Sequence, residues 1–375
     1  MRLVALLLFL VLFASGCLCG NGATVCPIII ANSSFDWAIQ NSSWWTWIAQ
    51  HYNRMLVYAP AFDADLSWFP GGWAYKDMYS IIPGSSVATQ HPDWILRDAS
   101  GSFLYIPYAC SGGTCTQYAG DIGNPSFRAN WISEAQGMMR AGYKGMFLDD
   151  FNMRMQVGNG SGNLVTPIDR RTGQAMTTDA WRSYMADFVT EIRTAFPIAE
   201  LVENQVYFFA PATDPNVIRA TKQADYVWIE RAFNDGGLVG GSGTFGFETL
   251  LAFIDQIHMD GVGTIEEIQT SSQPEYALAC YFLTSTGGDG LSDRYTQAPG
   301  SWWSGNDVNL GSVRSLLHYR WNGLYRRDFT RGMVLVNEPG SPTVTANLGG
   351  SYTRLDGTVV SSVTIGAGDG VVLRR

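Results

Sequence analysis

Several short apolar runs in the middle of this chain end in acidic side chains. The run from Gly145 to Leu148 leads into Asp149 and Asp150, and the run from Ala224 to Ile229 leads into Glu230. Other acids at or near the ends of such runs are Glu203, Glu266, Glu267, Asp289 and Asp293. A carboxylate that follows a buried strand costs free energy unless it is solvated, paired or used. Several of them at one end of a sheet would make a site for acid–base or nucleophilic chemistry.

Alternating strands and helices must bring these acids together. From Cys26 to about Tyr295, short apolar runs alternate with amphipathic stretches, which is typical of βα units and a parallel sheet. About eight such units predict a (β/α)8 TIM barrel over residues 26–325. In that fold the functional groups lie where the strands end and the βα loops begin. The acids would then share one mouth of the barrel.

Helix caps and apolar periodicity place the individual elements. Asn124-Pro125 starts a helix that runs to about Ala141, because an N-cap is followed by proline at the first helical position. The stretch 61–120 is rich in loops, with one strand expected near Ser80–Pro83. The other expected helices are 44–52, 179–197, 214–223, 247–259 and 273–284, and the other expected strands are 27–31, 55–58, 144–149, 199–203, 224–230 and 262–268.

The carboxy-terminal part has a different pattern. From Phe329 onward short β-type runs are separated by turn residues, and Asp356-Gly357 is a hairpin signal. Residues 328–375 are therefore predicted to form a small antiparallel β domain packed on the barrel.

Strand alternation indicates which acids face the barrel interior. Tyr226, Trp228 and Glu230 share one face of their strand. In the strand before Asp150, Phe147 shares a face with Asp149, so Asp149 is favoured as the inward acid. Asp150 takes that place if the strand twists or ends one residue early. Two carboxyl groups that face one bond are what glycoside hydrolysis requires.

A family resemblance rests on three segments. Gly145-Met-Phe-Leu-Asp-Asp-Phe-Asn152, preceded by Asp121-Ile-Gly-Asn-Pro125 and a helix, resembles hypothetical glycosyl hydrolase family 15. The segments Asp225–Arg231 and Gly332–Asn337 fit the same pattern, and the likeness covers residues 26 to 375. The resemblance implies a TIM-barrel glycosidase.

The resemblance also implies roles for single residues. By analogy with alpha-galactosidase-like and dextranase-like barrels, Asp149 would be the nucleophile and Glu230 the general acid/base. Double displacement with retention would follow if their carboxyl groups lie roughly 5 to 5.5 Å apart. Asp121 matches the family's Asp before Gly-Asn-Pro and would line the substrate cleft. The further candidates for binding the carbohydrate are Tyr58, Tyr118, Glu203, Asn204, Trp228 and Arg231.

Other functions stay open at this point. A surface carbohydrate-binding barrel without turnover would need aromatics and amides but no pair of acids. A second alternative moves the chemistry to Glu203 with Glu266 or Glu267, and a lyase or a transglycosidase could use the same carboxyl groups. The Gly-rich stretch 236–243 lacks the Lys-Ser/Thr of a phosphate loop and is expected to be a flexible loop beside Glu230.

The amino-acid composition limits the kinds of ligand that the protein is expected to bind. The formal net charge is -9, which argues against nucleic acid as a ligand. Only four His are present and none is close to a Cys pair in the sequence, so we expect no metal, and no cofactor is expected either. The 13 Trp and 17 Tyr are compatible with sugar stacking as well as with a large core.

The amino terminus and the cysteines indicate export. Residues 1–17 combine an arginine, an apolar run and small residues before Cys17, which is typical of an export signal, with Cys17 as the expected lipid anchor of a cell-envelope lipoprotein or a secreted protein. The anchor is the only membrane contact expected. Cys110 and Cys115 bracket a Gly-rich loop and are expected to form a disulfide, which leaves Cys26 and Cys280 as a second possible pair.

Overall fold

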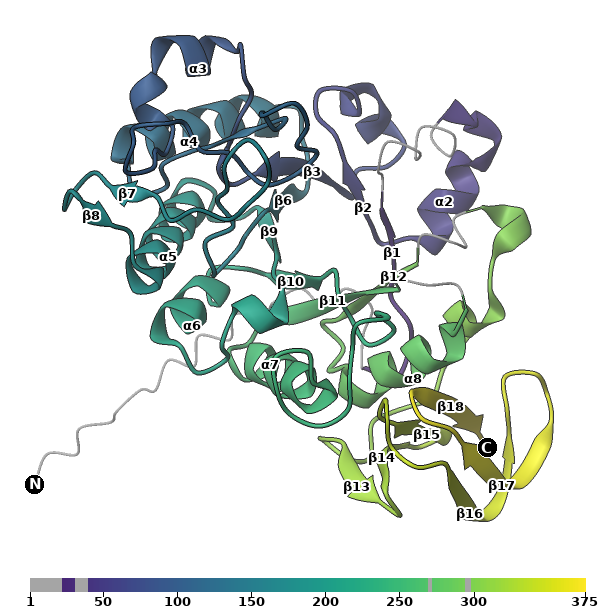
Figure 1. Cartoon of the computed structure of the whole chain (residues 1–375). Helices are drawn as coiled ribbons and strands as arrows, with labels where there is room; N and C mark the ends of the chain where they lie inside the picture. Colours follow the sequence, from purple (N-terminus) through teal and green to yellow (C-terminus); the bar gives the residue numbers. More distant parts are fainter. Residues whose placement is uncertain (1–21, 31–39, 269–271, 294–297) are drawn as a thin grey trace, which may run out of the picture.

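The computed structural model describes residues 22–30, 40–268, 272–293 and 298–375. The predicted export signal and Cys17 lie outside these residues. Eight parallel strands close a barrel in the order β1-β12-β11-β10-β9-β6-β3-β2 (Figure 1). The strands are β1 (Pro27–Ile30), β2 (Arg54–Val57), β3 (Gly72–Asp77), β6 (Gly145–Asp149), β9 (Glu200–Asn204), β10 (Tyr226–Ile229), β11 (Gly263–Ile268) and β12 (Gly290–Asp293). The predicted (β/α)8 barrel is confirmed.

Helices connect most of these strands. They are α2 (Trp45–His51) after β1, α4 (Pro125–Met139) after β3, α5 (Thr178–Ala195) after β6, α6 (Pro215–Thr221) after β9, α7 (Phe247–Met259) after β10 and α8 (Pro274–Thr284) after β11. The Asn124 side chain caps α4 by accepting from Ser126 N at 2.9 Å, as the Asn-Pro pair predicts. A 3-10 helix, Asp63–Ser67, takes the place of the second helix.

The third barrel strand, β3, corrects the prediction. We expected the only strand of this region near Ser80–Pro83, but the barrel strand lies before it, over Gly72–Asp77. The expected strand exists as the short β4 (Ser80–Ile81), which pairs with β5 (Tyr118–Ala119) outside the barrel. Pro70-Gly71-Gly72 looks like a turn in the sequence, yet Gly72 begins the strand, because parallel pairing with β2 and β6 supplies the hydrogen bonds.

The barrel interior determines which side chains reach the mouth. Its apolar residues include Trp73 on β3, Phe147 on β6, Val202 on β9, Trp228 on β10 and Ile265 on β11. Side chains on a strand return to the same face every second residue. The residues two positions further along therefore point inward at the carboxyl ends of the strands: Tyr75, Asp149, Asn204, Glu230 and Glu267.

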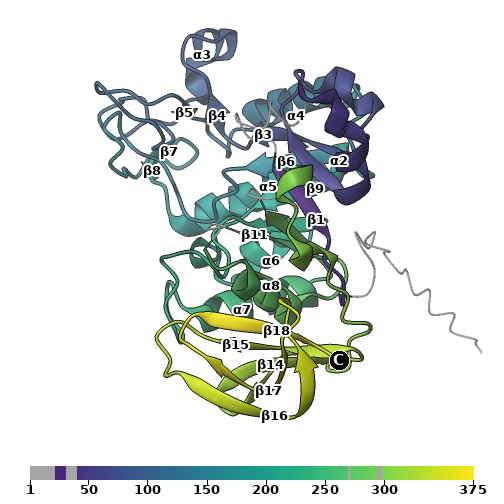
Figure 2. The same ribbon diagram turned by 90° about the vertical axis from the view of Figure 1, so that its right-hand side faces the viewer.

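Two long excursions build one rim of the mouth. The first excursion lies between β3 and α4 and contains β4, β5 and the short helix α3 (Ser86–Gln90). The second lies between β6 and α5 and contains a hairpin of β7 (Ile168–Asp169) and β8 (Gln174–Ala175). They pair through a bridge between Tyr105 and Gly158. Figure 2 shows both projecting to the same side of the barrel. The predicted disulfide between Cys110 and Cys115 closes a loop of the first excursion.

The other cysteine pairing is wrong. Cys26 is disulfide-bonded, but Cys280 is a free thiol, buried in α8. In the part of the chain that the structure describes, we find no helix long and apolar enough to cross a membrane.

The carboxy-terminal domain is a six-stranded antiparallel sheet, as predicted. Its strands are β13 (Tyr319–Trp321), β14 (Leu324–Phe329), β15 (Gly332–Asn337), β16 (Val344–Thr353), β17 (Val359–Ile365) and β18 (Asp369–Arg374), in the order β13-β14-β15-β18-β16-β17. β16 is a single strand with an irregular register between Asn347 and Tyr352. The sheet begins at Tyr319, ahead of the residue 328 at which the sequence suggested a boundary.

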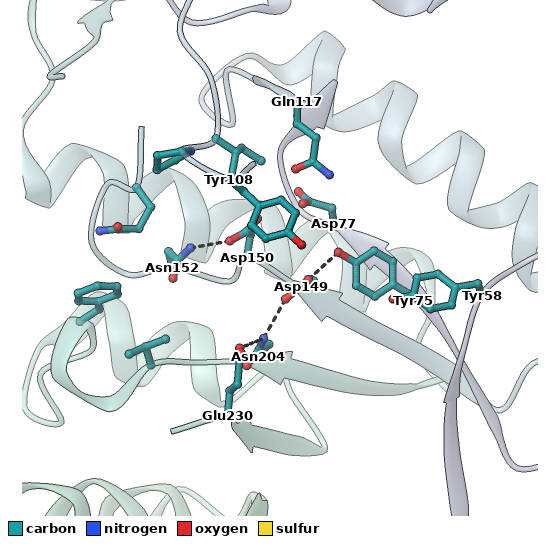
Figure 3. Close-up of a pocket in the computed structure, with 15 residues that line it drawn as sticks. Tyr58, Tyr75, Asp77, Tyr108, Gln117, Asp149, Asp150, Asn152, Asn204 and Glu230 are labelled. Carbon is teal, nitrogen blue, oxygen red and sulfur yellow. Dashed lines mark hydrogen bonds between the residues drawn. The ribbon is translucent and has the colours of Figure 1, made fainter. Parts of the chain in front are cut away.

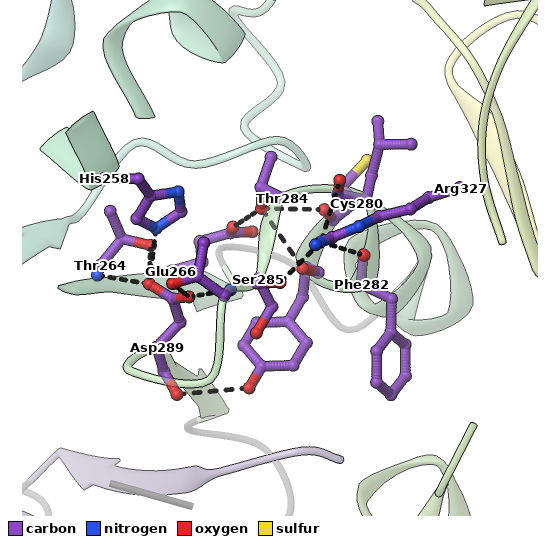
Figure 4. A network of polar contacts seen from close by, with 12 residues as sticks. His258, Thr264, Glu266, Cys280, Phe282, Thr284, Ser285, Asp289 and Arg327 are labelled. Atoms are coloured by element: carbon purple, nitrogen blue, oxygen red, sulfur yellow. Dashed lines mark hydrogen bonds and ion pairs between the residues drawn. The ribbon is translucent and has the colours of Figure 1, made fainter. Parts of the chain in front are cut away.

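A buried arginine joins this domain to the barrel. Arg327 on β14 donates to the carbonyl oxygens of Phe282, Leu283 and Ser285, at the end of α8, at 3.1, 3.4 and 2.6 Å (Figure 4). The last carbonyls of a helix have no partner within it, so Arg327 satisfies groups that would otherwise be buried unpaired.

Candidate active site

A cavity of about 650 Å³ opens at the carboxyl ends of the strands from β2 to β10. Tyr58 follows β2, Tyr75 and Asp77 lie on β3, and Asp149 lies on β6. Asp150, Asn204 and Glu230 complete the polar lining from the neighbouring strand ends (Figure 3). The structure thus brings Asp149, Asp150, Asn204, Glu230 and Tyr58 into one cavity, in the mouth where the acids were expected to meet.

One hydrogen-bonded chain links the two proposed catalytic acids. Tyr75 Oη donates to Asp149 Oδ2 at 2.5 Å, and Asn204 Nδ2 donates to Asp149 Oδ1 at 2.8 Å. The same Asn204 nitrogen lies 3.2 Å from Glu230 Oε2. Both carboxyl groups accept from one amide nitrogen, so these two oxygens are no further apart than the sum of the two distances. Asn204 sets the spacing of the two acids.

Asp150 reaches the cavity by a different route from Asp149. Its backbone has φ +53°, in the left-handed region that side chains other than Gly rarely adopt. This turn ends β6 and keeps the carboxyl in the cavity lining although Asp150 follows the inward Asp149 directly. Asn152 Nδ2 donates to Asp150 Oδ1 at 3.0 Å. Burial, and then the charge of Asp149, raises the pKa of Asp150 to about 6.

The acids also affect the tyrosines of the cavity. Burial, and then the nearby charges of Asp149 and Asp77, raises the pKa of Tyr75 well above its ordinary value. The pKa of Tyr58 is raised by the same two causes, burial and the charge of Asp149. The rings of Tyr58 and Tyr75 lie 4.9 Å apart between centroids. Both hydroxyls therefore stay protonated, and Tyr75 acts as a donor to Asp149.

Some predicted site residues lie elsewhere. Asp121 is buried and ion-paired with Arg171 at 2.9 Å, so it ties the two excursions together instead of lining the cavity. Tyr118 packs against Tyr105, with 4.9 Å between ring centroids, and its neighbour Gln117 lines the cavity. Arg231 forms an ion pair with Asp235 outside the lining.

Two other predicted residues are barrel residues below or behind the cavity. Trp228 is buried in the barrel interior, and its Nε1 donates to Glu267 Oε2 at 2.9 Å. Glu203 lies next to the inward Asn204 on β9, so it faces outward, where Gln205 Nε2 donates to it at 2.6 Å. Burial raises the pKa of Glu203 well above its ordinary value.

The alternative acids do not line the cavity. Glu266 is buried, accepts from Thr284 Oγ1 at 2.8 Å and has a pKa raised to about 8 by burial. Glu267 points inward but lies beneath the cavity lining, against Trp228. The side chain of Asp293 is outside the described part of the structure.

Sequence reasoning missed Tyr75 and Asp77. Both lie on β3, the strand that was assigned to a loop-rich stretch. With that strand recognised, the alternation from Trp73 to Tyr75 would have placed the tyrosine beside Asp149. Among the described residues, no group of three or more His, Cys, Asp or Glu side chains is arranged to hold a metal ion.

Comparison with known proteins then decides the family. A family model described as hypothetical glycosyl hydrolase family 15 matches residues 54–333, which is well over half of the chain. The chain belongs to this family. Hypothetical glycosyl hydrolase family 15 was the resemblance that the strand-end motifs indicated. A search of curated proteins finds no match.

Two solved amylase structures share the fold of this chain, and a third solved structure has a weaker likeness to it. An alpha-amylase from Lactobacillus plantarum is 10% identical with a TM-score of 0.52, and the match covers 94% of this chain and 99% of that one. The noncanonic maltogenic alpha-amylase AmyB from Thermotoga neapolitana is 11% identical with a TM-score of 0.52, covering 93% and 98%. The glycoside hydrolase domain of PelA from Pseudomonas aeruginosa is 16% identical with a TM-score of 0.40, covering 73% and 95%. The family supports a glycoside hydrolase, and the two amylase structures show the same fold.

Proposed function

We propose that this protein is a retaining glycoside hydrolase that cleaves an O-glycosidic bond of an oligo- or polysaccharide. Asp149 is the nucleophile and Glu230 the general acid/base. The observation that carries the proposal is the Asn204 amide nitrogen, 2.8 Å from one carboxyl group and 3.2 Å from the other. One amide nitrogen that bridges the two carboxyl groups supports the short separation of roughly 5 to 5.5 Å that a retaining enzyme uses.

The surroundings of the two acids suit these roles. Tyr75 and Asn204 donate to the two oxygens of Asp149, which orients the carboxylate and leaves its lone pairs directed at the cavity. Asp149 attacks the anomeric carbon while Glu230 gives its proton to the leaving oxygen. Glu230 then takes a proton from water, and that water releases the sugar from Asp149. After the first step Glu230 is a carboxylate and Asp149 is bound to the sugar, and the second step returns both carboxyl groups to their starting protonation.

We further propose that the protein acts outside the cytoplasm. The disulfide of Cys110 and Cys115 is compatible with an exported protein. The export signal and the lipid anchor at Cys17 belong to this proposal, and mass spectrometry of the mature amino terminus would test them.

Activity on a panel of oligo- and polysaccharides tests the function. Asp149→Asn and Glu230→Gln should each lower kcat by at least about 10²- to 10⁴-fold on any substrate that wild type cleaves. Asp150→Asn tests whether Asp150 is the nucleophile instead of Asp149, and it should lower kcat less than Asp149→Asn does. Glu203→Gln and Glu266→Gln test the alternative acids, and Asp93→Asn, an exposed carboxyl outside the cavity, is the control.

Two outcomes would reject the assignment. If Glu230→Gln keeps wild-type turnover, the acid/base is another residue. If wild type binds glycans but cleaves none of them, the protein is a carbohydrate-binding barrel without turnover.

A further inference from the structure

One end of the cavity is acidic and, among the described residues that line it, has no basic partner. Asp77, Asp149, Asp150 and Glu230 all line it, whereas no Lys, Arg or His does. Going round the barrel from β3 to β10, Asp77 lies on one side of Asp149 and Glu230 on the other, and the carboxyl group of Asp150 contacts that of Asp77. Figure 3 shows Tyr108 and Gln117 projecting over the Asp77 side.

Asp77 carries an oxygen with no hydrogen-bond donor. The residue is 9% exposed, and its Oδ1 accepts from the backbone nitrogens of Tyr79 at 2.8 Å and Ser80 at 2.7 Å. Its Oδ2 is buried and receives no N–H hydrogen bond from any described residue, and its carboxyl group contacts that of Asp150. Two carboxylate oxygens in contact repel unless a proton or a cation lies between them.

The charges around Asp77 and Asp150 also favour a proton or a cation between the two carboxyl groups. Burial, and then the charges of Asp150 and Asp149, raises the pKa of Asp77 well above its ordinary value. For Asp150 the charged neighbours that raise the pKa are Asp149 and Glu230, after burial. Among the described residues that line the cavity no Lys, Arg or His offsets these acids, so the contact between Asp77 and Asp150 favours one proton shared by the pair.

A metal ion does not suit this arrangement, because the described residues offer no group of three or more acidic, His or Cys ligands around one point. An organic ammonium does suit it. An ammonium group has three N–H donors, which separate carboxyl oxygens can accept, and charge-assisted bonds of this kind are about twice as strong as neutral ones.

We propose that the subsite beside Asp149 takes a sugar unit with a free ammonium group, a deacetylated amino sugar, bound by Asp77 and Asp150. This inference rests on the proposed function, because Glu230 protonates the leaving oxygen and the leaving unit therefore lies on the Glu230 side. The ammonium replaces the proton that Asp77 and Asp150 share, and that proton passes to solvent. A uronate or a sulfated unit would be repelled, and an N-acetylated unit lacks the charge.

Calorimetry on the full-length mature protein tests this at pH 6. The probes are glucosamine, galactosamine and mannosamine, each compared with its parent hexose and with its N-acetyl derivative. At least one amino sugar should bind tenfold or more tightly than both of its neutral counterparts. Titrations in two buffers with different ionisation enthalpies should show proton release on binding.

Variants separate the site from the rest of the cavity. Asp77→Asn should remove both the preference and the proton release, and Asp150→Asn should weaken the preference. Asp93→Asn, an exposed carboxyl outside the cavity, should keep both. Circular dichroism melts of each variant establish that the fold is intact.

The outcomes distinguish this inference from the proposed function. Hydrolysis that needs Asp149 and Glu230 but shows equal affinity for amino and neutral sugars would overturn the ammonium site and leave the hydrolase standing. An ammonium preference that Asp77→Asn leaves intact would also overturn it, as would calcium binding that depends on Asp77 without any amino-sugar binding. A preference lost in Asp77→Asn, in a protein that cleaves no glycan, would support the site and reject the hydrolase.

Discussion

At the scale of single residues, Asp150 combines two unfavourable features. Its backbone is left-handed at φ +53°, and its carboxyl is buried beside Asp77 and Asp149. Strained residues of this kind persist where the surrounding structure holds them, and they concentrate at functional sites. We infer that the strain is the consequence of placing two consecutive acids, Asp149 and Asp150, in one cavity.

Replacing Asp150 should therefore stabilise the protein at neutral pH. Asn tolerates the left-handed region and keeps the side-chain shape. The pKa of Asp150 is raised to about 6 from an ordinary value of 3.8, so ionising it costs more in the folded than in the unfolded state. Asp150→Asn should raise the free energy of unfolding by about 2 to 3 kcal/mol at pH 7.

The gain should depend on pH. It should be largest above pH 6 and should shrink as the pH falls from 6 toward 3.8, because Asp150 then becomes protonated in the folded state and, below 3.8, in the unfolded state too. Urea unfolding of wild type and Asp150→Asn at several pH values measures this. A gain that is the same at pH 4 and pH 7 would mean that backbone strain, not the charge, is the cause.

At the scale of elements, most helices and strands were predictable. The exceptions are β3, which was not predicted, and β9, whose inward face was not assigned. Period-2 alternation from Phe147 and from Trp228 predicted the inward faces of β6 and β10. The same rule applied to Val202 would have turned Glu203 outward and Asn204 inward. β3 was not predicted, because Gly71 and Gly72 resemble a turn. Its strand conformation depends on pairing with β2 and β6, and β6 is distant in the sequence.

The Gly-rich loop after β10 is held more firmly than its composition suggests. Glu338, beside the end of β15, accepts from Gly241 N at 2.8 Å and from Arg320 at 2.7 Å. Gly240 lies so close to Pro339 that a Cβ there would meet its carbonyl oxygen at 2.1 Å. The carboxy-terminal sheet thus fixes the position of a loop that leads from the Glu230 end of the cavity.

Removing that anchor should loosen the loop. Glu338→Ala should speed amide hydrogen exchange over residues 239–246 by about tenfold or more, because a charge-assisted hydrogen bond is lost. Hydrogen–deuterium exchange with mass spectrometry measures this, and Glu134→Ala, an exposed carboxyl on α4, is the control. Unchanged exchange in Glu338→Ala would show that the glycine contacts alone hold the loop.

At the scale of the whole molecule, the barrel and the carboxy-terminal sheet share polar contacts in their interface. Arg327 on β14 is 2% exposed, and besides the carbonyl groups at the end of α8 it donates to Leu316 O, just before the sheet, at 3.2 Å. Burial lowers the pKa of Arg327, although Asp289 and Asp255 partly offset this. The sheet therefore supplies the hydrogen-bond donor for the last carbonyl groups of α8, and we expect the barrel and the sheet to unfold together.

Arg327→Met tests this coupling. It should lower the free energy of unfolding by roughly 3 kcal/mol or more, since several buried carbonyls lose their donor. Arg326→Met, which removes the partly exposed ion pair with Asp328, should cost about 1 kcal/mol or less. Calorimetric melts should show one transition for wild type. Two separate transitions in wild type, or equal losses in the two variants, would contradict the coupling.

The anomeric configuration of the first product tests whether Asp149 and Glu230 act by double displacement. Proton NMR of the reaction, recorded on a cleaved substrate before mutarotation proceeds, reports that configuration. Retention is predicted from the proposed double displacement, which the bridge of one Asn204 amide between the carboxyl groups of Asp149 and Glu230 supports. Inversion would contradict the account, because it would require a water between the two acids.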